Sequence, residues 1–114
     1  MQMPELIRRT AEKELSHYCD IKIPPCFRNE VRVDFQIEDD CATLFEERIV
    51  HANPGKWARR HVAQFRFNRQ LNQWSLHYPD SRHSWRLYLN AGPSLNFKAL
   101  LKAVDDDPLN SFWD

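Results

Sequence analysis

The residues best suited to binding or chemistry form a short basic cluster in the middle of the chain. Lys56 and Trp57 begin it, Arg59 and Arg60 follow, and His61 ends it. A tryptophan flanked by guanidinium groups can stack on a nucleic-acid base while the arginines contact phosphate, as in single-strand binders. Large aromatic side chains are usually buried, so the same tryptophan can instead fix its loop to a sheet. We favour this structural interpretation and keep the cluster as a candidate binding site.

A polar sheet face is the second candidate surface. Apolar and polar residues alternate over residues 62–68, 74–78 and 85–89, which predicts three antiparallel strands. The set predicted to face the core comprises Phe65, Phe67, Trp74, Tyr78 and Trp85. The outward set that we add to the candidate binding residues comprises Arg66, His77, Arg86 and Tyr88. Such a face can bind RNA, but ion pairs with acids of neighbouring strands would make it an ordinary solvated lattice, which we favour.

Catalysis is not predicted. Glu46 and Glu47 are neighbours on a predicted strand, so their side chains leave by opposite faces and cannot be the paired carboxylates of a glycosidase. Glu46 shares a face with Arg48 and is predicted to form an ion pair with it. The histidines lack zinc-protease spacing, and Gly55 and Gly92 belong to no phosphate-binding loop, dinucleotide fingerprint or nucleophile elbow. We therefore predict no catalytic residue, no metal site and no cofactor.

Charge is distributed unevenly along a chain whose formal net charge is zero. From Lys56 to Arg86 there are seven lysine and arginine residues and one acid, Asp80. Acids cluster instead in residues 34–47 and 105–107. Folding can bring these patches together so that they cancel, or hold them apart so that they steer an anionic partner, and the sequence leaves both outcomes open.

The composition predicts a soluble cytoplasmic protein with one domain over residues 1–114. A chain of 114 residues buries roughly two-thirds of its unfolded surface on folding, and 42% apolar residues can supply its core. The three cysteines have no paired close spacing, which predicts reduced thiols. The N-terminus shows no secretory pattern, and no run approaches the ~18 apolar residues of a membrane span.

The first half of the chain predicts a helix followed by strands. Pro4 suits a helix's first position, and an apolar stripe at helical spacing predicts an amphipathic helix that ends before Pro24. Alternation predicts a strand over residues 31–37. The run 42–49 carries apolar residues on both faces, which places it centrally in the sheet, and residues 50–60 are predicted to be a loop.

After the three-strand meander the chain returns to helix. Ser94 is predicted to cap a helix whose apolar residues recur at three and four positions from Phe97 onward. Asp107 before Pro108 predicts a short helical turn that directs Phe112 and Trp113 back at the domain. The predicted fold is α+β, with an N-terminal helix, a five-stranded antiparallel sheet and a C-terminal helix, both helices packed on one sheet face.

Several motifs together give the chain a resemblance to a known family. They are Ile23-Pro24-Pro25, Arg28, Val31-Arg32, Leu44-Phe45-Glu46-Glu47-Arg48, Pro54-Gly55-Lys56-Trp57, the run from Val62 to Phe67, Trp74-Ser75-Leu76, Asp80, Trp85, Asp107-Pro108 and Phe112-Trp113. On these residues the chain resembles the bacterial family known as domain of unknown function 3024, over nearly its whole length. The chain departs from the family pattern at Ile49 and at residues 81–83, which affects local backbone geometry. The family has no established activity, so the resemblance implies a fold and no function.

Three hypotheses for function follow. The first is a small cytosolic, non-catalytic module acting by protein association, for example as a homodimer through a sheet edge or through Phe112 and Trp113. The alternative is a nucleic-acid-binding module that uses the basic loop 56–61 and the outer sheet face. A less favoured alternative is a small hydrolase-type enzyme with a pocket that involves Glu46 or Glu47 and His61.

Overall fold

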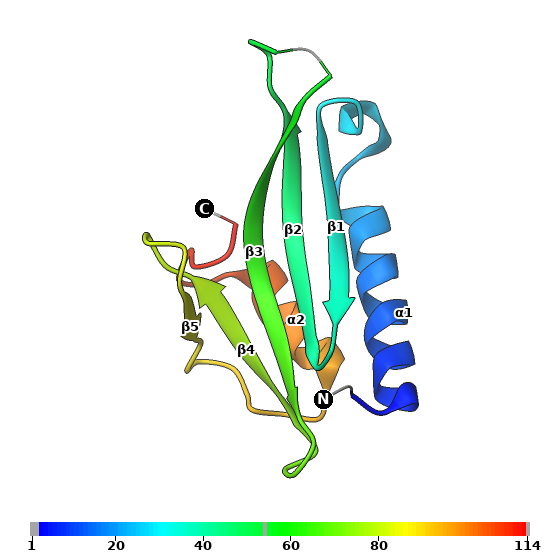
Figure 1. Ribbon diagram of the computed structural model, residues 1–114, viewed down its shortest axis with the longest axis vertical. Helices are drawn as coiled ribbons and strands as arrows, with labels where there is room; N and C mark the ends of the chain where they lie inside the picture. The colour runs from blue at the N-terminus through cyan, green and yellow to red at the C-terminus, as the bar shows by residue number, and fades with distance from the viewer. Residues whose placement is uncertain (1–2, 54, 114) are drawn as a thin grey trace.

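The computed structural model, which describes residues 3–53 and 55–113, has the predicted α+β architecture (Figure 1). Its elements are α1 (Glu5–Lys22), the short 3-10 helix η1 (Pro25–Phe27), β1 (Val31–Glu38), β2 (Cys41–Ile49), β3 (Trp57–Asn68), β4 (Gln73–Pro79), β5 (Trp85–Leu87) and α2 (Phe97–Asp106). The strands form one sheet in the order β1-β2-β3-β4-β5, and every neighbouring pair is antiparallel. The motif residue Pro54 lies outside the described residues.

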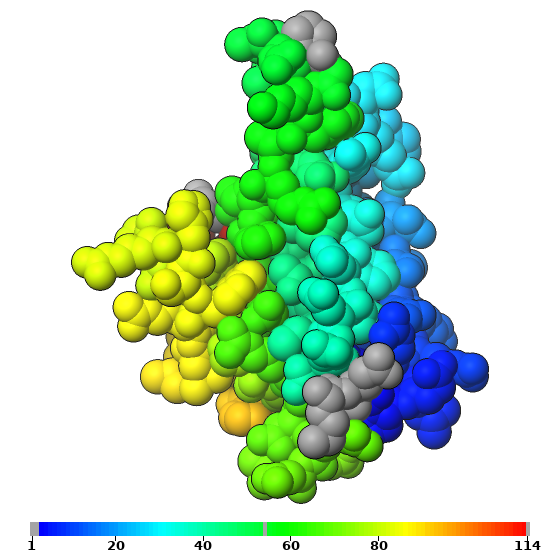
Figure 2. All heavy atoms as spheres, viewed as in Figure 1, coloured from blue at the N-terminus to red at the C-terminus, as the bar shows by residue number. Residues whose placement is uncertain are grey.

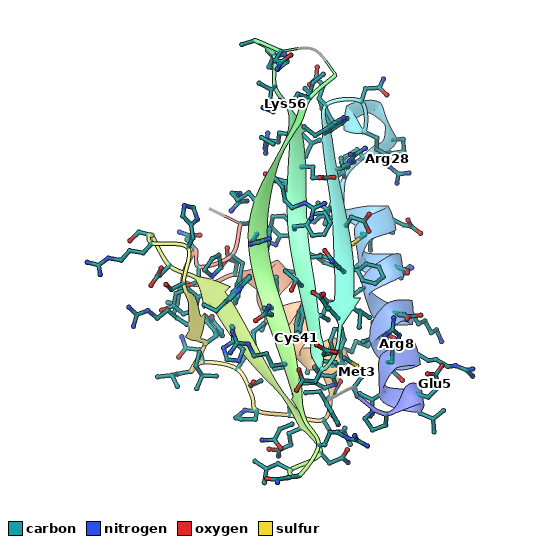
Figure 3. The ribbon with its side chains drawn as sticks, viewed as in Figure 1. Met3, Glu5, Arg8, Arg28, Cys41 and Lys56 are labelled. Carbon is teal, nitrogen blue, oxygen red and sulfur yellow. The ribbon has the colours of Figure 1, made fainter. Side chains whose placement is uncertain are left out.

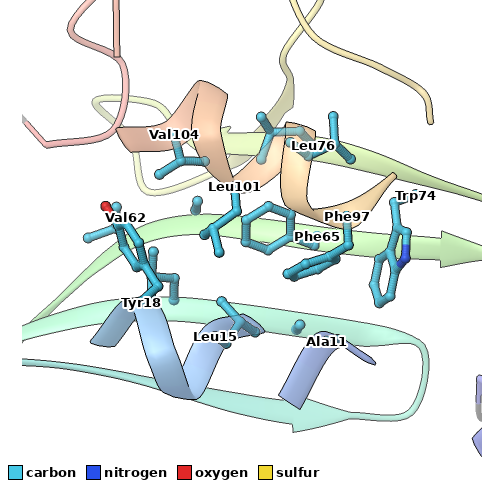
Figure 4. Packing of buried hydrophobic residues seen from close by; sticks show 14 of the residues in the cluster. Ala11, Leu15, Tyr18, Val62, Phe65, Trp74, Leu76, Phe97, Leu101 and Val104 are labelled. Atoms are coloured by element: carbon cyan, nitrogen blue, oxygen red, sulfur yellow. The ribbon is translucent and has the colours of Figure 1, made fainter. Parts of the chain in front are cut away.

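The core lies between the sheet and the two helices. α1 contributes Ala11, Leu15 and Tyr18, which share one face at helical spacing. α2 contributes a stripe that begins at Phe97, and these side chains meet β3 residues such as Phe65 (Figure 4). Figure 1 shows α2 behind the sheet and α1 alongside β1. Neither of these two helices covers the opposite face of the sheet.

The start of α2 differs slightly from expectation. Asn96, not Ser94, is the N-cap, and its side chain accepts a hydrogen bond from the N–H of Ala99 at 3.2 Å. Ser94 instead forms an isolated bridge with Trp74, in which each backbone N–H donates to the other residue's carbonyl. The connection after β5 is thereby tied to β4 before the helix begins.

A β-bulge in β3 sets which of its side chains face the core. The β2–β3 register shifts between Leu44 and Phe45, so that Phe45 pairs with His61, Leu44 pairs with Ala63, and Val62 is the extra residue. Val62 and Ala63 are consecutive, yet both are fully buried. Strict alternation along β3 is broken at this point, which turns its N-terminal half relative to the rest of the strand.

The basic cluster lies in β3 and not in a loop. β3 begins at Trp57 and pairs with β2 as far as Ile49, so the predicted loop over residues 50–60 is shortened to residues 50–56. Cross-strand pairing with β2 extends the strand further than the sequence pattern indicates, because backbone hydrogen bonds of Asn53 with Val50 and Lys56 confine the turn. Lys56 stands at the end of this long hairpin, where Figure 3 labels it.

The predicted orientation of β5 was wrong. In the β4–β5 register Pro79 pairs with Trp85 and Tyr78 pairs with Arg86, so Trp85 lies on the outer face and Arg86 on the helix side. Tyr88, predicted to point outward, is 4% exposed and packs on Phe112 with ring centroids 4.9 Å apart. Trp85 and Tyr88 are three residues apart, so a strand cannot bury both, and the C-terminal segment covers Tyr88.

Candidate functional site

The candidate site is built around the N-terminal half of β3, which has β2 on one side and no described strand on the other. β3 pairs with β2 from Trp57 to Arg66, but it pairs with β4 only from Gln64 to Asn68. Continued pairing would put Pro79 opposite the bulge, and proline has no N–H to donate to a ladder. Figure 1 shows the upper part of β3 standing clear of β4. Residues 57–63 therefore have an open edge on the β4 side.

Hydrogen-bond alternation identifies the backbone groups on this edge. The N–H of Val50 donates to the carbonyl of Lys56 at 2.9 Å, so the backbone polar groups of Lys56 face β2. In an antiparallel pair these groups point alternately toward and away from the partner strand. Ala58 therefore bonds to β2, whereas the N–H and C=O groups of Trp57 and Arg59 point to the open edge.

A cleft of about 680 Å³ adjoins the open edge. It is bounded by β3, by the β4–β5 turn and by the C-terminal segment, and its lining residues are Arg59, Arg60, His61, Pro79, Asp80, Ser81, His83, Trp85, Asn110, Ser111 and Phe112. Figure 2 shows the green atoms of upper β3 rising beyond the yellow atoms of the β4–β5 turn. A smaller hollow of about 340 Å³ on the outer face shares His61 and Trp85 with this cleft.

The C-terminal side of the cleft is held by two charged side chains. The carboxylate of Asp107 accepts hydrogen bonds from the N–H groups of Ser111 at 2.7 Å, Phe112 at 3.2 Å and Trp113 at 2.9 Å. The guanidinium of Arg60 donates to the carbonyls of Phe112 at 3.1 Å and Trp113 at 3.2 Å. Residues 108–112 form turns and bends and not the predicted helical turn, although Phe112 does return to the core.

Two glutamates on β2 hold the arginines of the site. Glu46, which is 6% exposed, accepts from Arg48 at 2.9 Å, as predicted, and its Oε1 lies 3.6 Å from Nε of Arg60. Glu47 leaves by the opposite face and accepts from Arg32 at 2.8 Å and Arg59 at 3.3 Å. Partial burial by itself would raise the pKa of Glu47, but these two arginines outweigh it and hold that pKa below its usual value.

Guanidinium groups and a histidine cover the aromatic rings of the outer face. Arg32 lies 4.1 Å from the ring centroid of Trp57, and Arg59 lies 3.8 Å from that of Phe45. His61 stacks on Trp85 with ring centroids 5.7 Å apart. The outer face therefore holds more aromatic rings than Tyr88 alone, but the protein's own side chains occupy their faces.

The structure divides the predicted site residues into three groups. Trp57, Arg59, Arg60 and His61 gather at the open edge, with Lys56 beside them at the hairpin end. Arg66 and His77 lie farther along the outer face, where Arg66 donates to the side-chain oxygen of Gln64 at 2.6 Å. Arg86 is paired with Asp80 at 2.9 Å, and Tyr88 belongs to the core, so neither adds to a binding surface with the others.

A contact between Ser75 and His77 on β4 was not predicted from the sequence, although residues two apart on a strand share a face. Nε2 of His77 lies 2.9 Å from Oγ of Ser75. Burial, together with the charge of Arg66, lowers the pKa of His77 to about 4. A histidine with so low a pKa is a weak general base at neutral pH, and no carboxylate in the described part of the chain hydrogen-bonds to it. We interpret this contact as structural.

The positions of other residues of the site could not be predicted from the sequence. Asp80 fixes the β4–β5 turn by accepting from the N–H groups of Arg82 at 2.8 Å and Ser84 at 2.9 Å. Trp85 and Phe112 line the cleft although both were assigned to the core, and only the pairing of distant segments brings them to β3. Over residues 3–53 and 55–113 no three His, Cys, Asp or Glu side chains are grouped so as to hold a metal ion.

The fold and this site define a small α+β domain in which one face of an antiparallel meander is covered by helices and the central strand β3 has a partly open edge. The family model described as a domain of unknown function, DUF3024, matches residues 3–114, and the chain belongs to this family. No curated protein and no solved structure matches the chain. None of the described helices combines the length and the apolar character needed to cross a membrane.

Proposed function

We propose that this domain is a non-catalytic protein-association module that receives an extended segment of a partner protein along the open edge of β3. The observation that carries this proposal is that residues 57–63 pair with β2 on one side but with no described strand on the β4 side. Backbone groups of Trp57 and Arg59 are available there for a further ladder. Strand addition of this kind obtains affinity from main-chain hydrogen bonds and specificity from pockets beside the strand.

The cleft supports this proposal by giving the added segment space. Sheet edges without a partner are usually blunted by charged side chains and bulges, and β3 has both Arg59 and the bulge at Val62. Those features limit indiscriminate pairing with other chains. A cleft of about 680 Å³ directly beside the edge is not needed for such protection, and it is wide enough to hold side chains of an incoming strand.

Nucleic-acid binding is supported less well. The rings of Trp57 and Phe45 are already covered by guanidinium groups, so a base would have to displace Arg32 or Arg59 before it could stack. Glu47 holds both arginines, and Asp80 holds Arg86. The candidate residues thus form the ion-paired lattice that we favoured from the sequence, in which the arginines can still attract an anion but the aromatic rings beneath them are covered.

The decisive test compares two substitutions at Arg59, of which one keeps the edge N–H and the other removes it. Short random peptides are displayed and selected for binding to the wild-type domain, and each binder's Kd is measured for wild type, Arg59→Ala and Arg59→Pro. Both variants lose the side chain, but only proline removes the N–H that points to the open edge. We expect Arg59→Pro to bind roughly tenfold or more weakly than Arg59→Ala, which lacks the same guanidinium but keeps the edge N–H.

A nucleic-acid titration completes the experiment. Labelled single-stranded and double-stranded DNA and RNA are titrated with the domain at low and at high ionic strength, because phosphate contacts weaken steeply with salt. We expect no salt-sensitive binding to any of them. Selected peptides that bind Arg59→Pro as well as wild type, or salt-sensitive nucleic-acid binding with no peptide binders, would refute the proposal.

A further inference from the structure

The arginines paired with Glu46 and Glu47 on β1, β2 and β3 outnumber these two acids. Arg48 and Arg60 share Glu46, and Arg32 and Arg59 share Glu47, so four guanidinium groups face two carboxylates. Among residues 3–53 and 55–113, two of these positive charges therefore have no carboxylate of their own. An incoming strand with carboxylates could supply the missing charges.

Arg60 and Arg59 carry the surplus charge closest to the edge. Arg48 already engages both oxygens of Glu46, at 2.9 and 3.4 Å, whereas Nε of Arg60 is 3.6 Å from the same carboxylate. The other donors of Arg60 go to the carbonyls of Phe112 and Trp113, which are dipoles and not anions. Arg59 likewise shares Glu47 with the shorter contact from Arg32.

The cleft has no spare acid for these groups among its described lining residues. Asp80 is the one acid there, and its carboxylate is occupied by Arg86 at 2.9 Å and by two backbone N–H groups of its own turn. The hydrogen bond from Arg86 is the main reason that the pKa of Asp80 lies below its usual value. His61 and His83 line the same cleft.

We infer that the partner segment carries two consecutive acidic residues, an inference that rests on the strand addition proposed above. Successive side chains of a strand leave by opposite faces, and Arg59 and Arg60 do so on β3. On the β2 side they are paired with the consecutive acids Glu47 and Glu46 in register. A partner strand on the other edge would mirror this arrangement, with one carboxylate beside Arg59 on the outer face and the next directed toward Arg60.

The same charge surplus disfavours a second copy of this chain at the edge. Two-fold pairing of β3 with its own copy would bring the uncompensated arginines of both copies together, and like charges directly opposite each other destabilise a sheet. The occupant is therefore an acidic segment of a different protein. Light scattering at working concentrations should report a monomer, and a dimer that Arg59→Pro abolishes would overturn this assignment of the occupant.

The amino-acid composition of the selected peptides tests whether the partner segment is acidic, separately from whether it adds to the sheet as a strand. Among binders that Arg59→Pro weakens, we expect pairs of consecutive Asp or Glu residues to be enriched over the starting library. Replacement of such a pair by Gln or Asn should raise Kd roughly tenfold at low ionic strength, and less at high ionic strength. Arg59→Gln retains the edge N–H and should reduce the same preference for acids.

The possible outcomes distinguish the acidic partner from strand addition itself. Binders that depend on the Arg59 N–H but show no acidic enrichment would overturn the acidic partner and leave strand addition in place. Absence of any binder that Arg59→Pro weakens would overturn strand addition itself. A circular dichroism spectrum and urea transition for each variant ensure that lost binding reflects the edge and not unfolding.

Discussion

Proline substitutions at two neighbouring positions of β3 should differ sharply in their effect on stability. Ala58 is exposed, and its backbone groups bond to β2, where it pairs with Arg48. Ala58→Pro deletes a ladder hydrogen bond between the two longest strands and leaves a carbonyl of Arg48 without its donor. Proline where a structural N–H is required costs about 3 kcal/mol or more. Little of this loss can come from the small exposed side chain of Ala58.

Arg59→Pro removes no ladder hydrogen bond if the edge is open. It does remove the guanidinium contacts with Glu47 and Phe45. An exposed ion pair of this kind contributes less than about 1 kcal/mol, and an exposed cation–π contact about 0.5–1 kcal/mol. Arg59→Ala loses both contacts as well, so it provides the matched reference. We expect Arg59→Pro to be within about 1 kcal/mol of Arg59→Ala, because proline is tolerated where an edge N–H faces solvent.

Urea denaturation followed by tryptophan fluorescence measures these free energies of unfolding by linear extrapolation. The expected order of stability is wild type, then Arg59→Ala and Arg59→Pro together, then Ala58→Pro far below. If Arg59→Pro is destabilised as severely as Ala58→Pro, the Arg59 N–H is bonded in the folded protein. The edge would then be closed, and the strand-addition proposal would lose its structural basis.

Three other predictions concern the supports of the site and the outer face. Asp107→Ala should lower the free energy of unfolding by about 1–3 kcal/mol, because three backbone N–H groups lose their acceptor, and it should shift the fluorescence of Trp113; an unchanged spectrum would contradict this. Tyr88→Phe should raise the free energy of unfolding by roughly 1 kcal/mol, because the buried Tyr88 hydroxyl has no hydrogen-bond partner among the described residues, whereas a loss of stability would reveal one. The pKa of His77 is about 4 in the folded protein, below its ordinary 6.5, so the unfolded state binds a proton first as the pH falls. The contribution of His77 to the free energy of unfolding is therefore fully present above pH 6.5 and is lost as the pH falls toward 4. His77→Gln should make the free energy of unfolding, measured against pH, flatter over this range than in wild type.

The local sequence pattern was sufficient to predict most of the helices and strands. The helical stripe of residues 5–22 and the alternation in β1 and β4 depend on side-chain spacing alone, so the predicted elements match the structure closely. The Glu46–Arg48 ion pair followed from the same rule, because residues two apart on a strand share a face. The basic cluster was likewise visible as composition, and three of its arginine and histidine residues do line the cleft.

Contacts between distant segments of this chain decided the features that the local sequence pattern could not predict. The sequence around Trp57 resembles a loop, and only pairing with β2 makes it a strand. Alternation restricts Trp85 and Tyr88 to opposite faces but does not say which is buried, and Phe112, which packs on Tyr88, settles that choice. The bulge at Val62 adds a shift of one residue that periodicity does not reveal.

The amino-acid sequence by itself determined the order of helices and strands, the apolar face of the sheet and the concentration of basic residues after Lys56, because each depends on neighbours along the chain. The tertiary structure alone decided that the pairing of β4 with β3 stops at His77, that a cleft opens beyond it and that four arginines of β1, β2 and β3 share two glutamates. Strand pairing and charge balance arise between residues far apart in the chain, so they exist only once the chain has folded.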